Sequence, residues 1–67
     1  MTEHETSVRQ VVQQAMLENS LVWVVTKLAS NEEQPVSWRN TNVFVTLSGE
    51  LIDIRDVLVI RFLGQKQ

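Results

Sequence analysis

The sequence predicts a small, mainly β, α+β fold, in which one N-terminal helix precedes a five-stranded barrel or strongly bent sheet. Apolar residues follow a helical period in the first quarter of the chain and a strand pattern from Leu21 onward. Polar turn residues divide the second part into short runs. With 67 residues there is room for one hydrophobic core, so we expect a single domain over residues 1–67.

The helix is expected over residues 7–18. Two capping boxes compete for its start, Thr2 with Glu5 and Ser7 with Gln10, because each pairs a hydroxyl with a side chain three residues on. Asn19 can adopt the left-handed conformation that ends a helix. The apolar positions have the spacing of one helical face: Val8, Val11, Val12, Ala15 and Met16.

The first two strands are expected over residues 21–28 and 36–39. The first is rich in β-branched residues and is apolar on both alternating faces, which indicates burial on both sides. Residues 30–34 are polar and are predicted to form a loop. Pro35 can open the second strand, because a first position loses no ladder hydrogen bond.

Three further strands are expected over residues 43–47, 50–54 and 57–62. Ser48-Gly49 fits a tight hairpin connection between the third and fourth strands. Arg55-Asp56 fits a short corner before the last strand. The first and last strands are more apolar than so small a barrel can bury alone, which predicts contact with another subunit.

The composition excludes several functional classes. The chain has no cysteine and a single histidine, His4, so we expect no metal site and no cofactor. No nucleophile and base are placed together, so we expect no enzyme activity. No apolar run reaches a membrane span and the N-terminus is acidic, which favours a soluble cytoplasmic protein without a signal peptide.

Net charge and size set expectations about partners. A net charge of −2 argues against strong non-specific attraction to phosphate backbones, so any contact with nucleic acid should be local. A core this small nearly balances the ordering entropy, and without disulfides or metals the remaining source of extra stability is oligomerisation. We therefore expect a homo-oligomer.

A helix followed by five strands, with a break at residues 36–42, resembles the Sm-like family and in particular bacterial Hfq. Ser7-Val8-Arg9-Gln10-Val11 and Trp38-Arg39-Asn40-Thr41-Asn42 look like the divergent cyanobacterial Hfq branch. Val57-Leu58-Val59-Ile60, after Arg55-Asp56, is similar to the final strand of the family. The resemblance implies an SH3-like barrel and a ring, by analogy a hexamer, that binds RNA and regulates gene expression after transcription.

The same resemblance implies the position of an RNA site. Asn40, Thr41, Asn42 and Arg55 match the family positions that line the pocket near the pore, with Arg55 supplying the charge. The chain departs from the family where Arg55-Asp56 replaces a lysine-histidine pair, which removes much of the positive surface that holds uridine-rich RNA.

Three further residues are accessory candidates, each with a structural alternative: Arg39, Arg61 and Trp38. An exposed indole can stack on a base, but Trp23 and Trp38 also suit a core or a subunit interface. The arginines can contact phosphate or pair with neighbouring carboxylates. A protein-binding adaptor or inhibitor that has the same fold and does not bind nucleic acid is therefore the alternative function.

Overall fold

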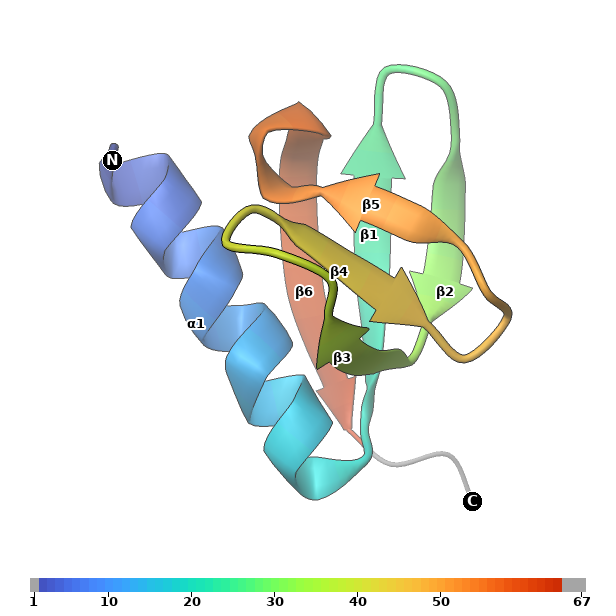
Figure 1. Cartoon of the computed structure of the whole chain (residues 1–67). Helices are drawn as coiled ribbons and strands as arrows, with labels where there is room; N and C mark the ends of the chain where they lie inside the picture. The colour runs from blue at the N-terminus through green and yellow to red at the C-terminus, as the bar shows by residue number, and fades with distance from the viewer. Residues whose placement is uncertain (1, 65–67) are drawn as a thin grey trace.

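A computed structural model describes residues 2–64 as one helix followed by six antiparallel strands in two three-stranded sheets (Figure 1). The α+β class and the N-terminal helix are confirmed, whereas five strands are not. The elements are α1 (Glu3–Glu18), β1 (Leu21–Thr26), β2 (Ser30–Glu33), β3 (Pro35–Trp38), β4 (Val43–Thr46), β5 (Leu51–Asp53), a 3-10 turn η1 (Ile54–Asp56) and β6 (Val57–Gly64).

Helix α1 begins four residues earlier than the predicted residue 7, because the Thr2–Glu5 capping box forms. The Thr2 hydroxyl accepts from the Glu5 backbone N–H at 3.1 Å, and the Glu5 carboxylate accepts from the Thr2 N–H at 3.4 Å. Two donors at the helix start are thereby satisfied. At the other end Asn19 takes the left-handed conformation, with φ of 52°, as predicted.

Sheet A has the strand order β2-β1-β6 and contains the clearest error of the sequence analysis. Residues 30–34 were expected to form a loop, but Ser30–Glu33 is strand β2 and pairs with β1 from Val22 to Val25. The side chains of β2 are polar and do not alternate with apolar ones. The segment is a strand because its backbone hydrogen-bonds to β1. Consequently β1 ends at Thr26, two residues before the predicted end.

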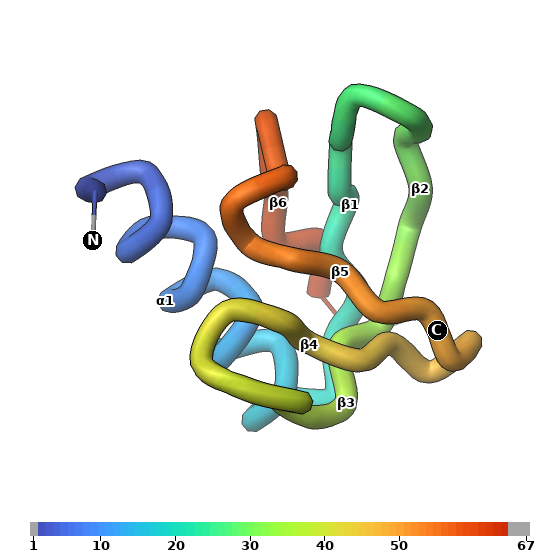
Figure 2. The backbone as a smooth tube through the Cα atoms, turned by 45° about the horizontal axis from the view of Figure 1, so that its top comes forward, coloured from blue at the N-terminus to red at the C-terminus, as the bar shows by residue number. Residues whose placement is uncertain are grey.

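Sheet B has the order β3-β4-β5, and the chain enters it from sheet A through the single residue Gln34. Figure 2 follows the backbone as it bends from β2 into β3. Pro35 opens β3 as predicted. The expected hairpin joins β4 to β5, where Gly49 has φ of 92° and donates to the Thr46 carbonyl at 2.9 Å.

The two sheets do not close into the predicted barrel. Within residues 2–64, β5 pairs only with β4, and β6 pairs only with β1. The 3-10 turn η1 joins these two strands and turns the chain from one sheet to the other, so they do not lie in one ladder. Both strands therefore keep a free hydrogen-bonding edge.

The core lies between the sheets and is covered on one side by α1 (Figure 1). Phe44 is the largest fully buried side chain, and its ring meets Trp38 edge-on at a centroid distance of 6.1 Å. The buried apolar residues come from the helix and from both sheets: Val8, Val12, Ala15, Val22, Val24, Phe44, Ile54 and Val57.

Replacement of Phe44 by alanine should remove most of the folding stability. A Phe→Ala change in a packed core costs about 3–5 kcal/mol, which is a large share of what a domain of this size possesses. Urea unfolding followed by circular dichroism measures the loss. Leu47→Ala is the matched control, because Leu47 lies nearby in the chain and is exposed; equal effects of the two changes would contradict this core.

Candidate functional site

The loop between β3 and β4 contains three of the four residues in the predicted RNA site. The Asn40 side-chain carbonyl accepts from the backbone N–H groups of Asn42 and Val43, at 2.9 and 3.0 Å. Asn40 therefore shapes the loop through its own side chain, as asparagine commonly does in turns. The Thr41 side chain is exposed, and Asn42 is half-buried.

A backbone hydrogen bond connects this loop to η1. The Ile54 N–H donates to the Asn42 carbonyl at 2.8 Å, and Ile54 is fully buried beneath. Because Arg55 follows Ile54 directly, the fold brings the fourth predicted residue to the same end of sheet B as the loop. Asn40, Thr41, Asn42 and Arg55 thus form one surface from two segments that are distant in sequence, which we call the loop–turn surface.

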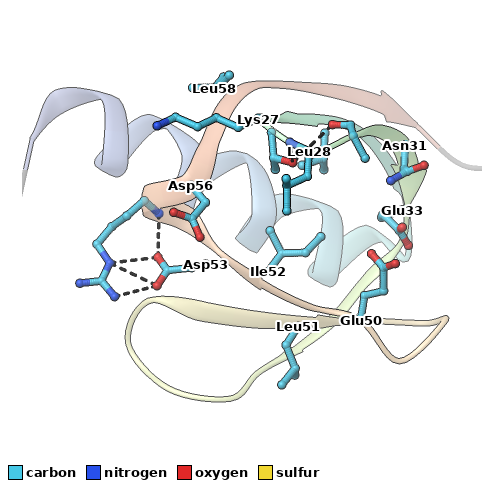
Figure 3. Close-up of a pocket in the computed structure, with 14 residues that line it drawn as sticks. Lys27, Leu28, Asn31, Glu33, Glu50, Leu51, Ile52, Asp53, Asp56 and Leu58 are labelled. Atoms are coloured by element: carbon cyan, nitrogen blue, oxygen red, sulfur yellow. Dashed lines mark hydrogen bonds and ion pairs between the residues drawn. The ribbon is translucent and has the colours of Figure 1, made fainter.

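The charge of Arg55 is largely offset within this surface. Its guanidinium donates to both carboxylate oxygens of Asp53, through Nη2 at 2.7 Å and Nε at 3.0 Å (Figure 3). The Arg55 backbone N–H also donates to the same carboxylate at 2.8 Å. The ion pair that the sequence offered as the alternative to a phosphate contact is therefore formed.

The pairing moves the pKa values of both groups. Hydrogen bonds from the Arg55 side chain and then from its backbone N–H hold the pKa of Asp53 below its usual value. The hydrogen bond to Asp53, followed by the charge of that carboxylate, raises the pKa of Arg55. Arg55 nevertheless remains 60% exposed, so an incoming anion can reach the outer side of the guanidinium.

Arg9 belongs to the same surface and was missed as a site residue from the sequence, where it was named only within Ser7-Val8-Arg9-Gln10-Val11. Its guanidinium lies over the Trp38 ring, 5.2 Å from the centroid, and its Nη2 donates to the Asn42 side chain at 3.5 Å. Arg9 Nε is buried and has no hydrogen-bond partner among the described residues. Its position directly after the core residue Val8, at the border of the apolar stripe, was the available signal.

The accessory candidates are divided between two places. Trp38 is partly buried against the core, beneath Arg9, so its ring is not an open stacking platform. Arg39 is exposed just after β3, next to the loop. Arg61 lies on β6 opposite Trp23, in sheet A, and is not brought to the loop–turn surface.

His4 has a structural role that was not predicted from the sequence. It lies in the first turn of α1, and its Nε2 is 2.8 Å from the Val57 carbonyl oxygen. In the neutral tautomer that carries the Nε2 proton, the ring donates this bond to the carbonyl. His4 thus ties the helix start to the beginning of β6.

A pocket of about 560 Å³ lies between the β1–β2 hairpin and β5 (Figure 3). Its apolar lining includes Val24, Ile52 and Leu58, and in the view of Figure 3 Glu33 and Glu50 appear at the end away from Asp53. Four acidic residues and two basic ones line it in all, so its charge does not favour phosphate. The residues lining it are Val24, Thr26, Lys27, Leu28, Ala29, Asn31, Glu33, Glu50, Leu51, Ile52, Asp53, Arg55, Asp56 and Leu58.

Residues 2–64 contain no group of three or more histidine, cysteine or acidic side chains that could hold a metal ion. No helix in that range is long and apolar enough to cross a membrane. Comparisons of the chain with protein-family models, with curated proteins and with solved structures found no match.

Arg9→Ala should lower the free energy of unfolding by about 1 kcal/mol, because a partly desolvated cation–π contact contributes roughly 0.5–2 kcal/mol. Urea unfolding of Arg9→Ala, Trp38→Leu and the double variant gives the coupling between the two side chains. Arg39→Ala is the control, since Arg39 is exposed and lies outside this contact. Strict additivity of the Arg9 and Trp38 changes would contradict the contact.

Proposed function

We propose that this protein is an Sm-like subunit that assembles into a homo-oligomeric ring and acts as an RNA-binding post-transcriptional regulator. The observation that carries the proposal is that β5, an edge of sheet B, and β6, an edge of sheet A, do not pair with each other and each keep a free edge. The sequence resemblance to the Sm-like and Hfq proteins supports the RNA-binding part. The order helix, strands, 3-10 turn and last strand agrees with that resemblance.

The free edge of β5 has unpaired backbone groups. In an antiparallel ladder the hydrogen bonds alternate, and Thr46 donates to the Glu50 carbonyl at 2.9 Å. Leu51 and Asp53, out of phase with Glu50, therefore direct their backbone N–H and C=O groups away from β4. Leu51 is 55% exposed, so an arriving strand would also cover apolar surface.

The free edge of β6 offers a complementary partner. Four exposed apolar side chains lie along this strand and would be buried by a second copy: Leu58, Val59, Phe62 and Leu63. Contact between β5 of one copy and β6 of the next uses two different surfaces, so it is heterologous and repeats from copy to copy. Such a contact closes into a ring when the rotation per subunit permits, with six subunits by analogy to Hfq.

The loop–turn surface is the RNA site in this proposal. Asn42 and the exposed Thr41 offer hydrogen-bonding groups, and Arg55 and Arg9 offer cations from η1 and α1. A ring would present one such surface per subunit around its axis, so a short single strand could contact several. Because Asp53 offsets Arg55 and the net charge is −2, we expect modest affinity with strong dependence on salt.

A protein-binding adaptor or inhibitor is the second candidate, and the pocket beside β5 favours it. Arg55–Asp53 is the single ion pair within residues 2–64, so Glu33, Glu50 and Asp56 reach the pocket without a basic partner. An extended peptide with alternating basic and apolar residues matches that charge and the apolar lining. Such a function would use the same fold without RNA.

Light scattering on the purified protein tests assembly through the β5 edge. We expect a multiple of the monomer mass for the wild type and for Leu51→Ala, which keeps the edge N–H. Leu51→Pro should release monomers, because proline removes that donor and blocks pairing at an edge. Circular dichroism checks that each variant folds. A wild-type monomer at micromolar concentration would exclude the ring.

Titration with short U-rich and A-rich RNAs at two salt concentrations tests the RNA site. Arg55→Ala should weaken binding roughly tenfold, the loss expected for one charge-assisted contact, and should reduce the salt dependence. Asp53→Asn should strengthen binding, because it frees the guanidinium. Lys27→Ala, which removes one positive charge elsewhere, is the control. A ring that binds no RNA even at low salt would leave the adaptor as the better account.

A further inference from the structure

The outer face of sheet A is a flat, three-strand surface whose residues are fixed by the strand register. Cross-strand partners in an antiparallel sheet share a face, and successive residues alternate between faces. Trp23 pairs with Glu32 on one side and Arg61 on the other, and Val25 pairs with Ser30 and Val59. The outer face is thus two rows, Glu32-Trp23-Arg61 and Ser30-Val25-Val59.

No described part of the chain covers this face. The alternate residues of β1, Val22 and Val24, are buried and point into the core that α1 and sheet B share. Sheet B crosses in front of sheet A in Figure 1, on the inner side. On the outer side Val59 is 47% exposed, and Trp23 and Val25 are partly exposed and are not among the residues packed against the core. Trp23 and Val25 therefore form an apolar strip along the middle strand, with Val59 beside it on β6.

Two opposite charges flank the strip. Neighbouring strands lie about 4.8 Å apart, so Glu32 and Arg61, on either side of β1, are about 10 Å apart at their backbones. Neither makes an ion pair or a side-chain hydrogen bond within residues 2–64. Each charge is therefore available to a partner that brings the opposite charge to it.

We propose that the outer face of sheet A packs against the same face of a second copy, about a two-fold axis that runs parallel to β1 over Trp23. This axis exchanges the two outer strands, so Arg61 meets the partner's Glu32, and Glu32 meets the partner's Arg61. The apolar strips then lie on each other at the spacing of packed sheets, about 10 Å. Val59 faces the partner's Ser30, a small residue that leaves room for it.

The charges also select this orientation over its alternative. A two-fold axis perpendicular to the strands, within the interface, would place Glu32 on the partner's Glu32 and Arg61 on the partner's Arg61. Like charges in direct opposition disfavour that arrangement. The face is therefore complementary to itself in one orientation, which is the requirement for an isologous dimer contact.

This contact differs from the proposed ring contact. It is centred on side chains of β1 and β2 that stand perpendicular to sheet A, whereas ring closure pairs the backbone edges of β5 and β6 and covers the side chains along them, of which Val59 is the one shared with the face contact. If the ring forms, the face contact joins two rings and doubles the mass. If the ring does not form, the same contact gives a dimer of single chains.

Charge reversal in two complementary variants tests the proposal. In Glu32→Arg both flanking charges are positive, and in Arg61→Glu both are negative, so each variant alone should show half the wild-type mass by light scattering. An equimolar mixture of the two should regain the wild-type mass, because each variant then meets a partner of opposite charge. Only a contact between chains predicts this recovery.

Glu33→Arg is the matched control, since Glu33 follows Glu32 but pairs with Val22 and so belongs to the opposite face of β2. It should keep the wild-type mass. The face contact is contradicted if neither charge reversal lowers the mass, or if the mixture of the two variants stays at half the wild-type mass. Either result counts even when the ring is intact. Loss of the ring is recognised separately. Leu51→Pro should break rings into smaller units, but charge reversal should still halve the mass of those units.

Discussion

The packing of α1 against both sheets is the contact on which the rest of the structure depends. Each sheet has only three strands, and within residues 2–64 no ladder joins β5 to β6. Helix residues Val8, Val12 and Ala15 are buried against core residues from both sheets and so join them in one core. The contact also places Arg9 over Trp38 and His4 beside Val57. The helix therefore stabilises the opened sheet and completes its surface.

The sequence predicted well the features that depend on local chemistry. The amphipathic helix, its left-handed end at Asn19, the start of a strand at Pro35 and the turn at Gly49 all follow from single-residue preferences or from periodicity. Two possible helix starts were distinguished only by structure. Thr2 caps the helix, which adds a turn that carries His4.

Features that depend on pairing between distant segments were not predictable. Strand β2 consists of Ser-Asn-Glu-Glu, and nothing in that composition reveals that its backbone bonds to β1. Whether the two sheets close into a barrel depends on the backbone geometry at η1, and the apolar periodicity of the sequence does not predict that geometry. The same holds for the site: the turn near Asn42 and ion pairing of the arginines with nearby carboxylates were predicted, but the approach of Arg9 from the helix comes from tertiary packing.

The acidic strand β2 has a consequence for how this protein avoids aggregation. Exposed strand edges are templates for uncontrolled addition of further strands, and charged residues on an edge oppose it. Glu32 and Glu33 place two like charges on β2, so two copies of that edge repel each other. The apolar edges of β5 and β6 lack this protection along most of their length. Strand addition is thereby disfavoured at the β2 edge, so the same acidic side chains that gave this strand no apolar alternation also protect its exposed edge.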